Sequence, residues 1–216
     1  MKVTDKIEIK NEDNMALMSR YEDNYFDLAI VDPPYGIKRD GHKGTICKNK
    51  KHNWKQHEFR DWDKSTPTKE YFDELFRVSK NQIVWGANYF VEFLNRGSAG
   101  WVFWYKGQQG LTMSDGEIAY SSFNKATRMV NINRCFIAKN GGSIHPTQKP
   151  LKLYEFLLIN YAKEGDKILD THLGSGSIAI ACHNLGYELT ACELDKEYYN
   201  ASIKRIKDHI SQQRLF

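Results

Sequence analysis

The chain has 216 residues, enough for one domain with a sizeable core, and its 41% hydrophobic and 27% charged residues are ordinary for a soluble globular protein. Its apolar runs are far shorter than the roughly 18 residues of a membrane span, and residues 1–6 contain no apolar signal region. Four scattered cysteines without a Cys-x-x-Cys pair indicate a reducing compartment. We therefore expect a cytoplasmic protein without membrane contact.

Charge is unevenly distributed along the chain, whose net charge is +4. Residues 38–60 hold eight of the 31 basic residues but two of the 27 acidic ones, which leaves the rest slightly acidic. A basic segment on an acidic body indicates contact with a polyanion, although a solvated loop would have the same composition.

The first elements lead to a short apolar strand. Residues 6–10 alternate between polar and apolar and predict a half-buried strand, while residues 11–14 offer a helix cap before a short helix over 15–18. Residues 26–31 are apolar, end in β-branched side chains and predict a buried strand.

Asp32, Pro33, Pro34 and Tyr35 follow this buried strand directly. The two prolines fix φ near about −65° and remove two backbone donors, so the turn is stiff and its carbonyls are unclaimed. An acid, free carbonyls and an aromatic ring at one point suit a substrate with two N–H hydrogens and a flat surface, such as the exocyclic amino group of a nucleobase. A Pro-Pro loop that merely ends a strand is the structural alternative.

Residues 37–66 are our candidate for target recognition, because Trp54, Phe59 and Trp62 are interspersed there among the basic residues. We expect DNA contacts from Lys38, Arg39, Lys43, Lys48, Lys50, Lys51, Trp54 and Lys55. A five-residue spacing also connects His42, Cys47, His52 and His57. Zinc ligands are usually closer together and include two cysteines, so we expect no metal site.

The middle of the chain is predicted from its patterns alone. The expected elements are a helix over residues 67–78, a strand over 81–86, a short helix over 89–94, a strand over 101–105, and a hairpin of strands over 116–121 and 128–132. The aromatic residues of this region are expected to form core rather than ligand contacts.

Two further motifs occupy the last third of the chain. The run His145-Pro146-Thr147-Gln148-Lys149-Pro150 precedes a helix predicted over residues 151–162. A strand over 167–170 ends in Asp170, a glycine turn and a helix follow, and the next strand ends in Glu193. Glycines let the backbone approach a ligand and an acid can accept both ribose hydroxyls, so this region predicts a nucleotide site.

The glycine turn has two interpretations. Gly174-x-Gly176-x-x-Ala179, with Glu193 further on, fits a loose dinucleotide fingerprint and leaves a nicotinamide-dependent oxidoreductase as an alternative. The acid Asp170, four residues before the first glycine, instead favours an adenosylmethionine loop.

Together these motifs resemble those of the β-class, circularly permuted DNA amino-methyltransferases, which use S-adenosylmethionine, and in particular their N6-adenine type. The resemblance runs through nearly the whole chain and rests on Asp-Pro-Pro-Tyr, His-Pro-Thr-Gln-Lys-Pro and Asp-x-x-x-Gly-Ser-Gly-Ser. It implies a catalytic loop of Asp32, Pro33, Pro34 and Tyr35. It implies cofactor binding by Asp13, His145, Thr147, Lys149, Asp170, Leu173, Gly174, Ser175, Gly176 and Glu193.

Some roles follow from the resemblance alone. Asp13 would lie near the adenine of the cofactor, although it could also be a plain helix cap, and Lys149 would meet the carboxylate of the methionine moiety. Thr171-His172 depart from the Pro-Phe that is typical of the family, which leaves the role of His172 open.

The cofactor loop follows the catalytic loop, whereas it comes first in the unpermuted methyltransferase fold. The resemblance therefore predicts an α/β fold, a Rossmann-like class I methyltransferase sheet that is circularly permuted and has a small basic target-recognition insertion. Residues 1–216 should form a single methyltransferase domain, and the strand over residues 6–10 should complete the sheet after the last helix.

The implied function is N6 methylation of adenine in duplex DNA through a flipped base. Asp32 favours adenine, because cytosine-N4 enzymes of the class typically carry serine there. Cytosine N4, adenine in RNA and an inactive DNA-binding homologue remain alternatives. Dimerisation is common in the class, so the resemblance also implies that a homodimer could form. We expect a bacterial or phage-encoded protein, for which any partner restriction endonuclease would be separate.

Overall fold

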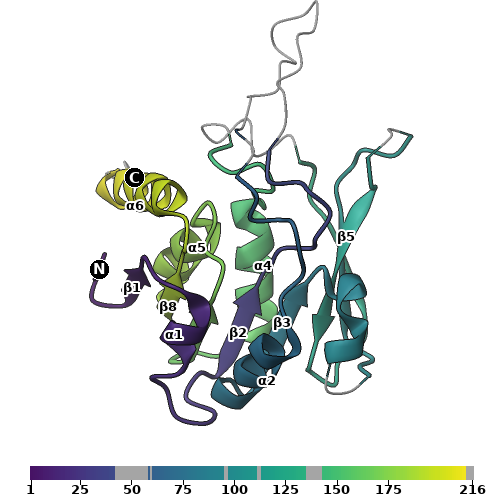
Figure 1. The fold of residues 1–216 in the computed structure, drawn as a ribbon, viewed down its shortest axis with the longest axis horizontal. Coiled ribbons are helices and arrows are strands. Elements are labelled where there is room, and N and C mark those ends of the chain that lie inside the picture. Colours follow the sequence, from purple (N-terminus) through teal and green to yellow (C-terminus); the bar gives the residue numbers. More distant parts are fainter. Residues whose placement is uncertain (42–57, 59, 95–96, 111–112, 135–142, 213–216) are drawn as a thin grey trace, which may run out of the picture.

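The structure is a computed structural model that describes residues 1–41, 58, 60–94, 97–110, 113–134 and 143–212. Its centre is an eight-stranded sheet in the order β1-β8-β7-β2-β3-β5-β4-β6 (Figure 1). The strands are β1 (Ile7–Lys10), β2 (Leu28–Val31), β3 (Gln82–Trp85), β4 (Trp101–Tyr105), β5 (Gly116–Ser121), β6 (Arg128–Asn131), β7 (Lys167–Asp170) and β8 (Glu188–Cys192). The helices are α1 (Asn14–Met18), α2 (Lys69–Val78), α4 (Leu151–Tyr161), α5 (Ser177–Leu185) and α6 (Lys196–Ser211), with 3₁₀ turns η2 (Ala87–Tyr89) and η3 (Val91–Phe93).

Strands β1, β8, β7, β2 and β3 are mutually parallel, whereas β5 pairs antiparallel with both β3 and β4. β1 lies beside β8, with Ile9 opposite Ala191. The strand predicted over residues 6–10 thus forms, as β1, the edge of the sheet beside β8, and β1 and α6 lie on one side of the molecule (Figure 1).

The predicted hairpin between residues 116–121 and 128–132 is wrong. β4 lies between β5 and β6, pairing antiparallel with β5 and parallel with β6. Val102 and Trp104 of β4 are fully buried, whereas three of the four residues of β6 are exposed. The more apolar strand therefore takes the inner position, and β6 forms the edge. The helix expected over 89–94 is likewise two separate 3₁₀ turns, η2 and η3.

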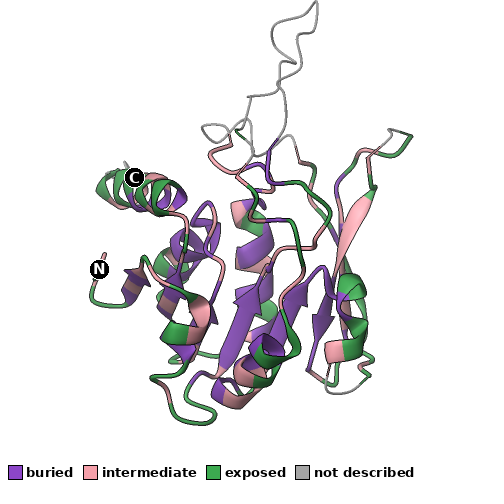
Figure 2. Ribbon diagram, viewed as in Figure 1, coloured by how far each residue is buried: buried purple, intermediate pink, exposed green. Residues whose placement is uncertain are grey.

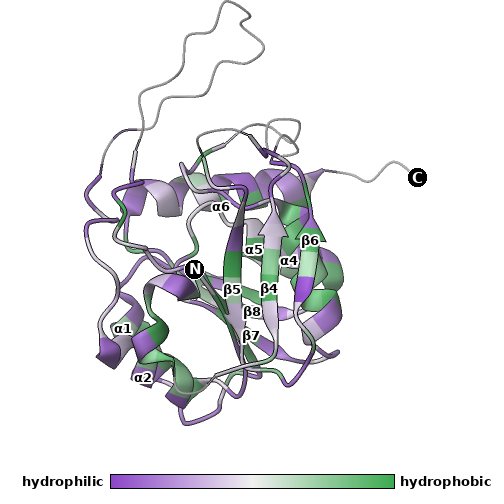
Figure 3. Ribbon diagram, turned by 90° about the vertical axis from the view of Figure 1, so that its right-hand side faces the viewer, coloured by the Kyte–Doolittle hydropathy of each residue, from purple (hydrophilic) through white to green (hydrophobic). Residues whose placement is uncertain are grey.

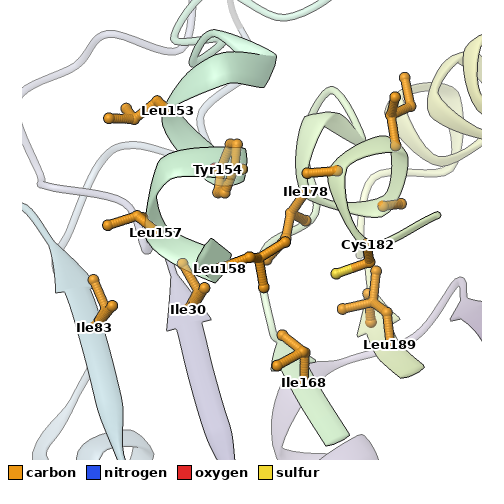
Figure 4. Packing of buried hydrophobic residues seen from close by; sticks show 14 of the residues in the cluster. Ile30, Ile83, Leu153, Tyr154, Leu157, Leu158, Ile168, Ile178, Cys182 and Leu189 are labelled. Carbon is orange, nitrogen blue, oxygen red and sulfur yellow. The ribbon is translucent and has the colours of Figure 1, made fainter. Parts of the chain in front are cut away.

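Helices cover both faces of the sheet, because alternate strand residues point in opposite directions. Ile83 and Trp85 of β3 belong to the core beneath α4 and α5, whereas Val84 belongs to the core beneath α1 and α2. Figure 4 shows Ile83 beside Leu157 of α4, and Figure 2 shows that the inner strands are buried along their length. Complete burial of a side chain such as Leu157 stabilises the fold by about 2 kcal/mol.

The distribution of apolar residues on each helix matches the way the helix packs in the fold. α4 is largely hydrophobic and packs on α5 and the sheet, whereas α2 has one apolar stripe and one polar face (Figure 3). Among the residues that the structure describes, no helix combines the length and apolar character needed to cross a bilayer. Because β2, β3, β7 and β8 are parallel, their carboxyl ends meet at one edge of the sheet, where ligands bind in open α/β folds.

Candidate active site

The loop that follows β2 is rigid and closely packed. Val31 is fully buried, and Asp32 and Tyr35 follow it at the mouth of a cleft. The Tyr35 ring lies against the backbone of Gly86, where an added Cβ would come within 2.1 Å of Tyr35 Cε1. Tyr89 stacks on the same ring, with centroids 5.1 Å apart and planes 15° apart. The ring of Tyr35 therefore has one fixed orientation.

Asp63 holds this loop through its backbone. Its Oδ1 accepts hydrogen bonds from the N–H groups of Tyr35 and Gly36, both at 2.8 Å, and its Oδ2 accepts one from Arg39 at 2.7 Å. The Asp63 residue is only 2% exposed. Sequence reasoning missed this role, because an aspartate in a polar segment looks like a solvated loop residue.

Both oxygens of Asp32 already have a partner. Tyr35 donates its hydroxyl to Oδ1 at 2.6 Å, and Lys149 Nζ lies 2.5 Å from Oδ2. Lys149 also lies 2.9 Å from Glu117 Oε2, and its side chain is 1% exposed. The lysine expected at the methionine carboxylate of a cofactor is thus engaged, in this structure, by two acids of the protein.

Burial and charge set the ionisation of this group. Burial raises the pKa of Asp32, and Lys149 opposes that rise. Burial would raise the pKa of Glu117 as well, but Lys149 and Lys106 lower it to about 2. Burial also raises the pKa of Tyr35 well above its usual value, so its hydroxyl stays protonated and donates to Asp32.

The glycine turn follows β7 at the next strand end. Gly174 has φ +52°, and an added Cβ there would meet nothing closer than the His145 ring at 3.8 Å. Gly176, at φ +72°, is instead packed against α6, where a Cβ would lie 2.9 Å from Ile206 Cδ1. At Gly174 the turn leaves space for no more than a methyl group before the His145 ring, and at Gly176 it brings α5 and α6 together.

Two acids flank this turn. Glu193 Oε2 accepts a hydrogen bond from the Gly174 N–H at 2.8 Å. Asp170 Oδ1 accepts one from the backbone of His172 at 3.0 Å, and burial raises the pKa of Asp170 to about 8. A buried acid with this pKa is protonated at neutral pH unless a cation binds beside it.

His172 is a neutral part of the same wall. The Asn14 amide donates to its Nε2 at 3.1 Å, so Nδ1 carries the proton and donates to Thr171 Oγ1 at 2.9 Å. Burial lowers the pKa of His172 to about 4. Its ring also meets Tyr71 edge-on, with centroids 5.3 Å apart. The imidazole thus packs as a neutral aromatic ring.

The His-Pro-Thr-Gln-Lys-Pro segment lies opposite the glycine turn. The His145 ring packs between Trp62, at 5.0 Å between centroids, and Tyr198, at 4.4 Å. Thr147 Oγ1 lies 3.1 Å from His145 Nδ1. His145 and Thr147 therefore form one side of the cleft at Gly174.

Asp13 is the N-cap of α1, as its alternative interpretation predicts. Its Oδ1 accepts hydrogen bonds from the N–H groups of Met15 and Ala16 at 2.9 and 3.1 Å. The residue also lines the cleft, so capping does not remove it from the candidate site.

One cleft of about 1440 Å³ brings the two halves of the site together. Of the expected catalytic and cofactor residues it is lined by Asp13, Asp32, Pro33, Pro34, Tyr35, His145, Thr147, Lys149, Leu173, Gly174, Ser175 and Glu193. Asp170 and Gly176 are not among the lining residues, although both adjoin residues that are. The cleft is also lined by Arg60 and Trp62 of the candidate recognition segment, and by residues that the sequence did not single out, namely Asp63, Tyr89, Lys106, Glu117 and Arg134.

Arg60 and Asp63 lie near the C-terminal end of the candidate recognition segment, and each contacts a different side of the cleft. Asp63 binds the catalytic loop as described, while Arg60 Nη1 donates to Asp195 at 3.1 Å and its guanidinium lies 4.9 Å from the centre of the Tyr198 ring. Lys38 and Arg39 are exposed, and Arg39 lines the cleft. The other expected DNA contacts and the four residues of the five-residue spacing, Lys43, Lys48, Lys50, Lys51, Trp54, Lys55, His42, Cys47, His52 and His57, lie outside the described residues.

Known proteins are similar to this chain in sequence or in fold. A family model described as DNA methylase matches residues 84–204, more than half of the chain. The type II methyltransferase M.HpaI of Haemophilus parainfluenzae is 25% identical over 232 residues, which cover 88% of this chain and 70% of that protein. The type II methyltransferase M2.DpnII of Streptococcus pneumoniae is 40% identical over 63 residues, which cover 29% of this chain and 24% of that protein.

Solved structures with the same fold include M1.HpyAVI in its SAM complex, with a TM-score of 0.60 at 18% identity, covering 92% of this chain and 99% of that one. The cytosine-N4-specific PvuII DNA methyltransferase has a TM-score of 0.59 at 15% identity, covering 95% of this chain and 92% of that one. These likenesses confirm the predicted α/β class I methyltransferase sheet.

Proposed function

The chain belongs to the DNA methylase family, and from this premise we propose that it transfers a methyl group from S-adenosylmethionine to N6 of adenine in duplex DNA. The observation that carries the proposal is the meeting of Asp32 and Tyr35 with the glycine turn in one cleft. One half of the cleft offers acceptors for an amino group, and the other offers a glycine turn between acids.

The residues of the glycine turn fit S-adenosylmethionine. Gly174 lines the cleft, and Glu193 retains lone pairs for ribose hydroxyls because each of its oxygens accepts one backbone N–H. Asp170, buried and without a cationic partner within hydrogen-bond distance among the described residues, would face the amino-acid end. When bound, the cofactor supplies an electrophilic methyl group on a sulfonium.

The protein would act on the target base by positioning it. Asp32 and the Pro33 carbonyl would accept the two amino hydrogens, which localises the nitrogen lone pair for attack. Tyr35, held by Asp63 and Gly86, would supply a flat apolar surface for the base. Because these groups are fixed before the substrate arrives, little reorganisation is needed during the reaction. The base must leave the duplex to reach them.

Adenine is proposed over cytosine because Asp32 stands where serine is typical of cytosine-N4 enzymes. The fold itself favours neither base, since a cytosine-N4-specific enzyme is among its structural neighbours. We further propose the β-class arrangement for the chain, with residues 1–216 as one methyltransferase domain. Within it, residues 37–66 would recognise the target, with Arg39 at the edge of the cleft.

The test is transfer of labelled methyl from S-adenosylmethionine to unmethylated duplex DNA, with matched single-stranded DNA and RNA, followed by identification of the modified nucleoside. We expect N6-methyladenine from duplex DNA, abolished by Asp32→Ala. The control Asp73→Ala, at an exposed acid of α2, should retain activity.

Each other result has a definite meaning. N4-methylcytosine would overturn the choice of base, and methylation of RNA alone would overturn the choice of DNA. Cofactor binding without any transfer would identify an inactive DNA-binding homologue.

A further inference from the structure

Four charged side chains meet where the target amino group would lie. Lys149 Nζ is 2.5 Å from Asp32 Oδ2 and 2.9 Å from Glu117 Oε2, and Lys106 Nζ is 2.6 Å from Glu117 Oε1. Asp32 has a role in the proposed function and Lys149 has one that the sequence resemblance implies, whereas Glu117 and Lys106 have none. The four groups, which we call the charge cluster, come from the β2 loop, the end of β4, the start of β5 and the segment before α4.

The ammonium of Lys149 poses an electrostatic problem for methyl transfer. Transfer forms the bond between the amino nitrogen and the methyl carbon as the sulfur–methyl bond breaks and S-adenosylhomocysteine is left. Positive charge thereby moves from the sulfonium to the nitrogen beside Asp32, until the nitrogen loses one of its protons to that carboxylate. An ammonium 2.5 Å from the same carboxylate opposes that movement. Because the Lys149 side chain is 1% exposed, solvent screens its charge poorly. Burial acts to lower the pKa of Lys149, but Asp32 and Glu117 raise it above the usual value, so the ammonium persists.

Glu117 resolves this problem by its charge. With its pKa near 2 it is ionised at neutral pH, and it makes the charge cluster neutral overall. Arg134 also senses this charge: burial lowers its pKa, and Glu117 opposes the shift. Loss of the Glu117 charge would leave the two ammonium groups of the charge cluster with the carboxylate of Asp32 alone to balance them.

Glu117 also fixes where the ammonium points. Lys149 has three N–H donors, and they are directed at Asp32, at Glu117 and, at 3.3 Å, at the hydroxyl of Tyr35. With Lys149 and Tyr35 each engaging a different oxygen of Asp32, each oxygen keeps a lone pair for a substrate N–H.

We propose that Glu117 is a positioning residue for the transferred methyl, which neutralises Lys149 and aims it so that Asp32 can accept an amino group that becomes positively charged. This inference rests on the proposed methyl transfer. Glu117 acts through Lys149 and Asp32, and Lys106 is the counter-ion that keeps Glu117 in place.

The first test is a charge-restoring pair of variants. Glu117→Gln keeps the shape and should lower kcat by roughly 10- to 100-fold with little change in KM for DNA. Adding Lys106→Met restores a neutral cluster and should recover a substantial part of the lost kcat. The control Glu92→Gln removes one negative charge from the exposed η3 turn and should keep wild-type kcat.

The second test requires no turnover. S-adenosylmethionine carries a sulfonium and S-adenosylhomocysteine a neutral thioether, so the ratio of their Kd values measures the local charge. Glu117→Gln should weaken S-adenosylmethionine relative to S-adenosylhomocysteine by at least roughly threefold, and the double variant should reverse this change. Lys106→Met alone leaves Glu117 in place and should move the ratio of the two Kd values in the opposite direction. If Glu117→Gln fails to fold, this variant by itself tests whether the charge of the cluster sets the ratio.

The outcomes separate this inference from the proposed function. An active wild-type protein with unchanged kcat and Kd ratio in Glu117→Gln would overturn the role of Glu117 alone. Loss of kcat without recovery in the double variant would show that shape, not charge, matters, and would overturn it too. A wild-type protein that binds the cofactor but methylates no nucleic acid would overturn the proposed function, and the Kd ratios would still test Glu117.

Discussion

The carboxylate of Asp63 accepts a hydrogen bond from the backbone N–H of Tyr35 at 2.8 Å, across 28 positions of the sequence. The same carboxylate binds two further N–H groups of the loop, those of Gly36 and Arg39. Asp63, near the C-terminal end of residues 37–66, therefore fixes the backbone of the residue on which the target nucleobase would lie.

Replacing Asp63 by Asn should damage both stability and catalysis. Asn has one acceptor oxygen, and its NH₂ group would face an N–H that the carboxylate now accepts. We expect the free energy of unfolding to fall by about 2 kcal/mol and kcat by at least roughly tenfold, because buried donors are left unpaired and Tyr35 is released.

Asp61→Asn is the matched control for this variant, because Asp61 is exposed two residues away and asparagine tolerates its φ of +61°. Chemical denaturation and methyl transfer measure the two effects. Equal behaviour of the two variants would show that Asp63 does not hold the loop.

Gly86→Ala should displace Tyr35. The φ of Gly86 is +67°, and its new Cβ would lie 2.1 Å from Tyr35 Cε1, which forces the ring to move. Gly165→Ala is a control with the same kind of backbone, since its φ is +85° and nothing lies within 4 Å of an added Cβ. Both variants should lose about 1 kcal/mol of stability from backbone strain.

Only the Gly86 variant should also lose most of its methyl transfer, measured with cofactor at saturation. A fully active Gly86→Ala protein would mean that the position of Tyr35 is not needed for catalysis. Equal loss in both variants would trace the effect to backbone strain.

The strands that carry the site could be predicted because each is a short apolar run with a functional residue at its end. Asp32, Asp170 and Glu193 follow such runs, and the structure places all three at one edge of the sheet. Local pattern was sufficient there, because parallel strands share their direction.

Other features depend on contacts between distant parts of the chain. β4 lies between β5 and β6, although the three strands have similar sequence patterns. Their order depends on which strand buries the most apolar surface, and a local pattern does not show this. Glu117 and Lys106 lie at the ends of strands whose sequences are typical of ordinary core strands. No residue adjacent to either one in the sequence indicates a functional role. Lys149, the other partner of Glu117, is more than 30 positions away from both, so no local pattern could have revealed the charge cluster.

His172 should make the protein less stable in acid. Its pKa in the folded state is about 4, below the usual 6.5, so between these values the unfolded chain binds a proton that the folded protein does not. Stability therefore rises with pH across that range and falls on acidification, by about 2 kcal/mol between pH 7 and pH 4.5.

His172→Gln keeps a hydrogen-bonding side chain but does not titrate. This variant should therefore lack the part of the loss of stability on acidification that comes from His172. His183→Gln, at an exposed histidine of α5, should not. The comparison is made from the denaturation midpoints of the wild-type protein and the two variants at pH 7 and pH 4.5. An equal loss of stability between these pH values in all three proteins would contradict a neutral, buried His172.

Asp170 should release a proton when the cofactor binds. Burial raises its pKa to about 8, so at pH 7 the free protein carries it mainly as the neutral acid. The α-ammonium of S-adenosylmethionine beside it would favour the carboxylate, and binding at pH 7 should therefore release close to one proton. Calorimetry in buffers of different ionisation enthalpy measures that number.

Two controls isolate the effect. Asp170→Asn should bind without this release, and 5′-methylthioadenosine, which lacks the amino-acid part, should cause little release even from the wild-type protein. At pH 9 Asp170 is already ionised and the release should disappear. Equal release with 5′-methylthioadenosine would place the titrating group elsewhere in the cleft, with Glu193, whose pKa is also raised by burial, as the next residue to replace.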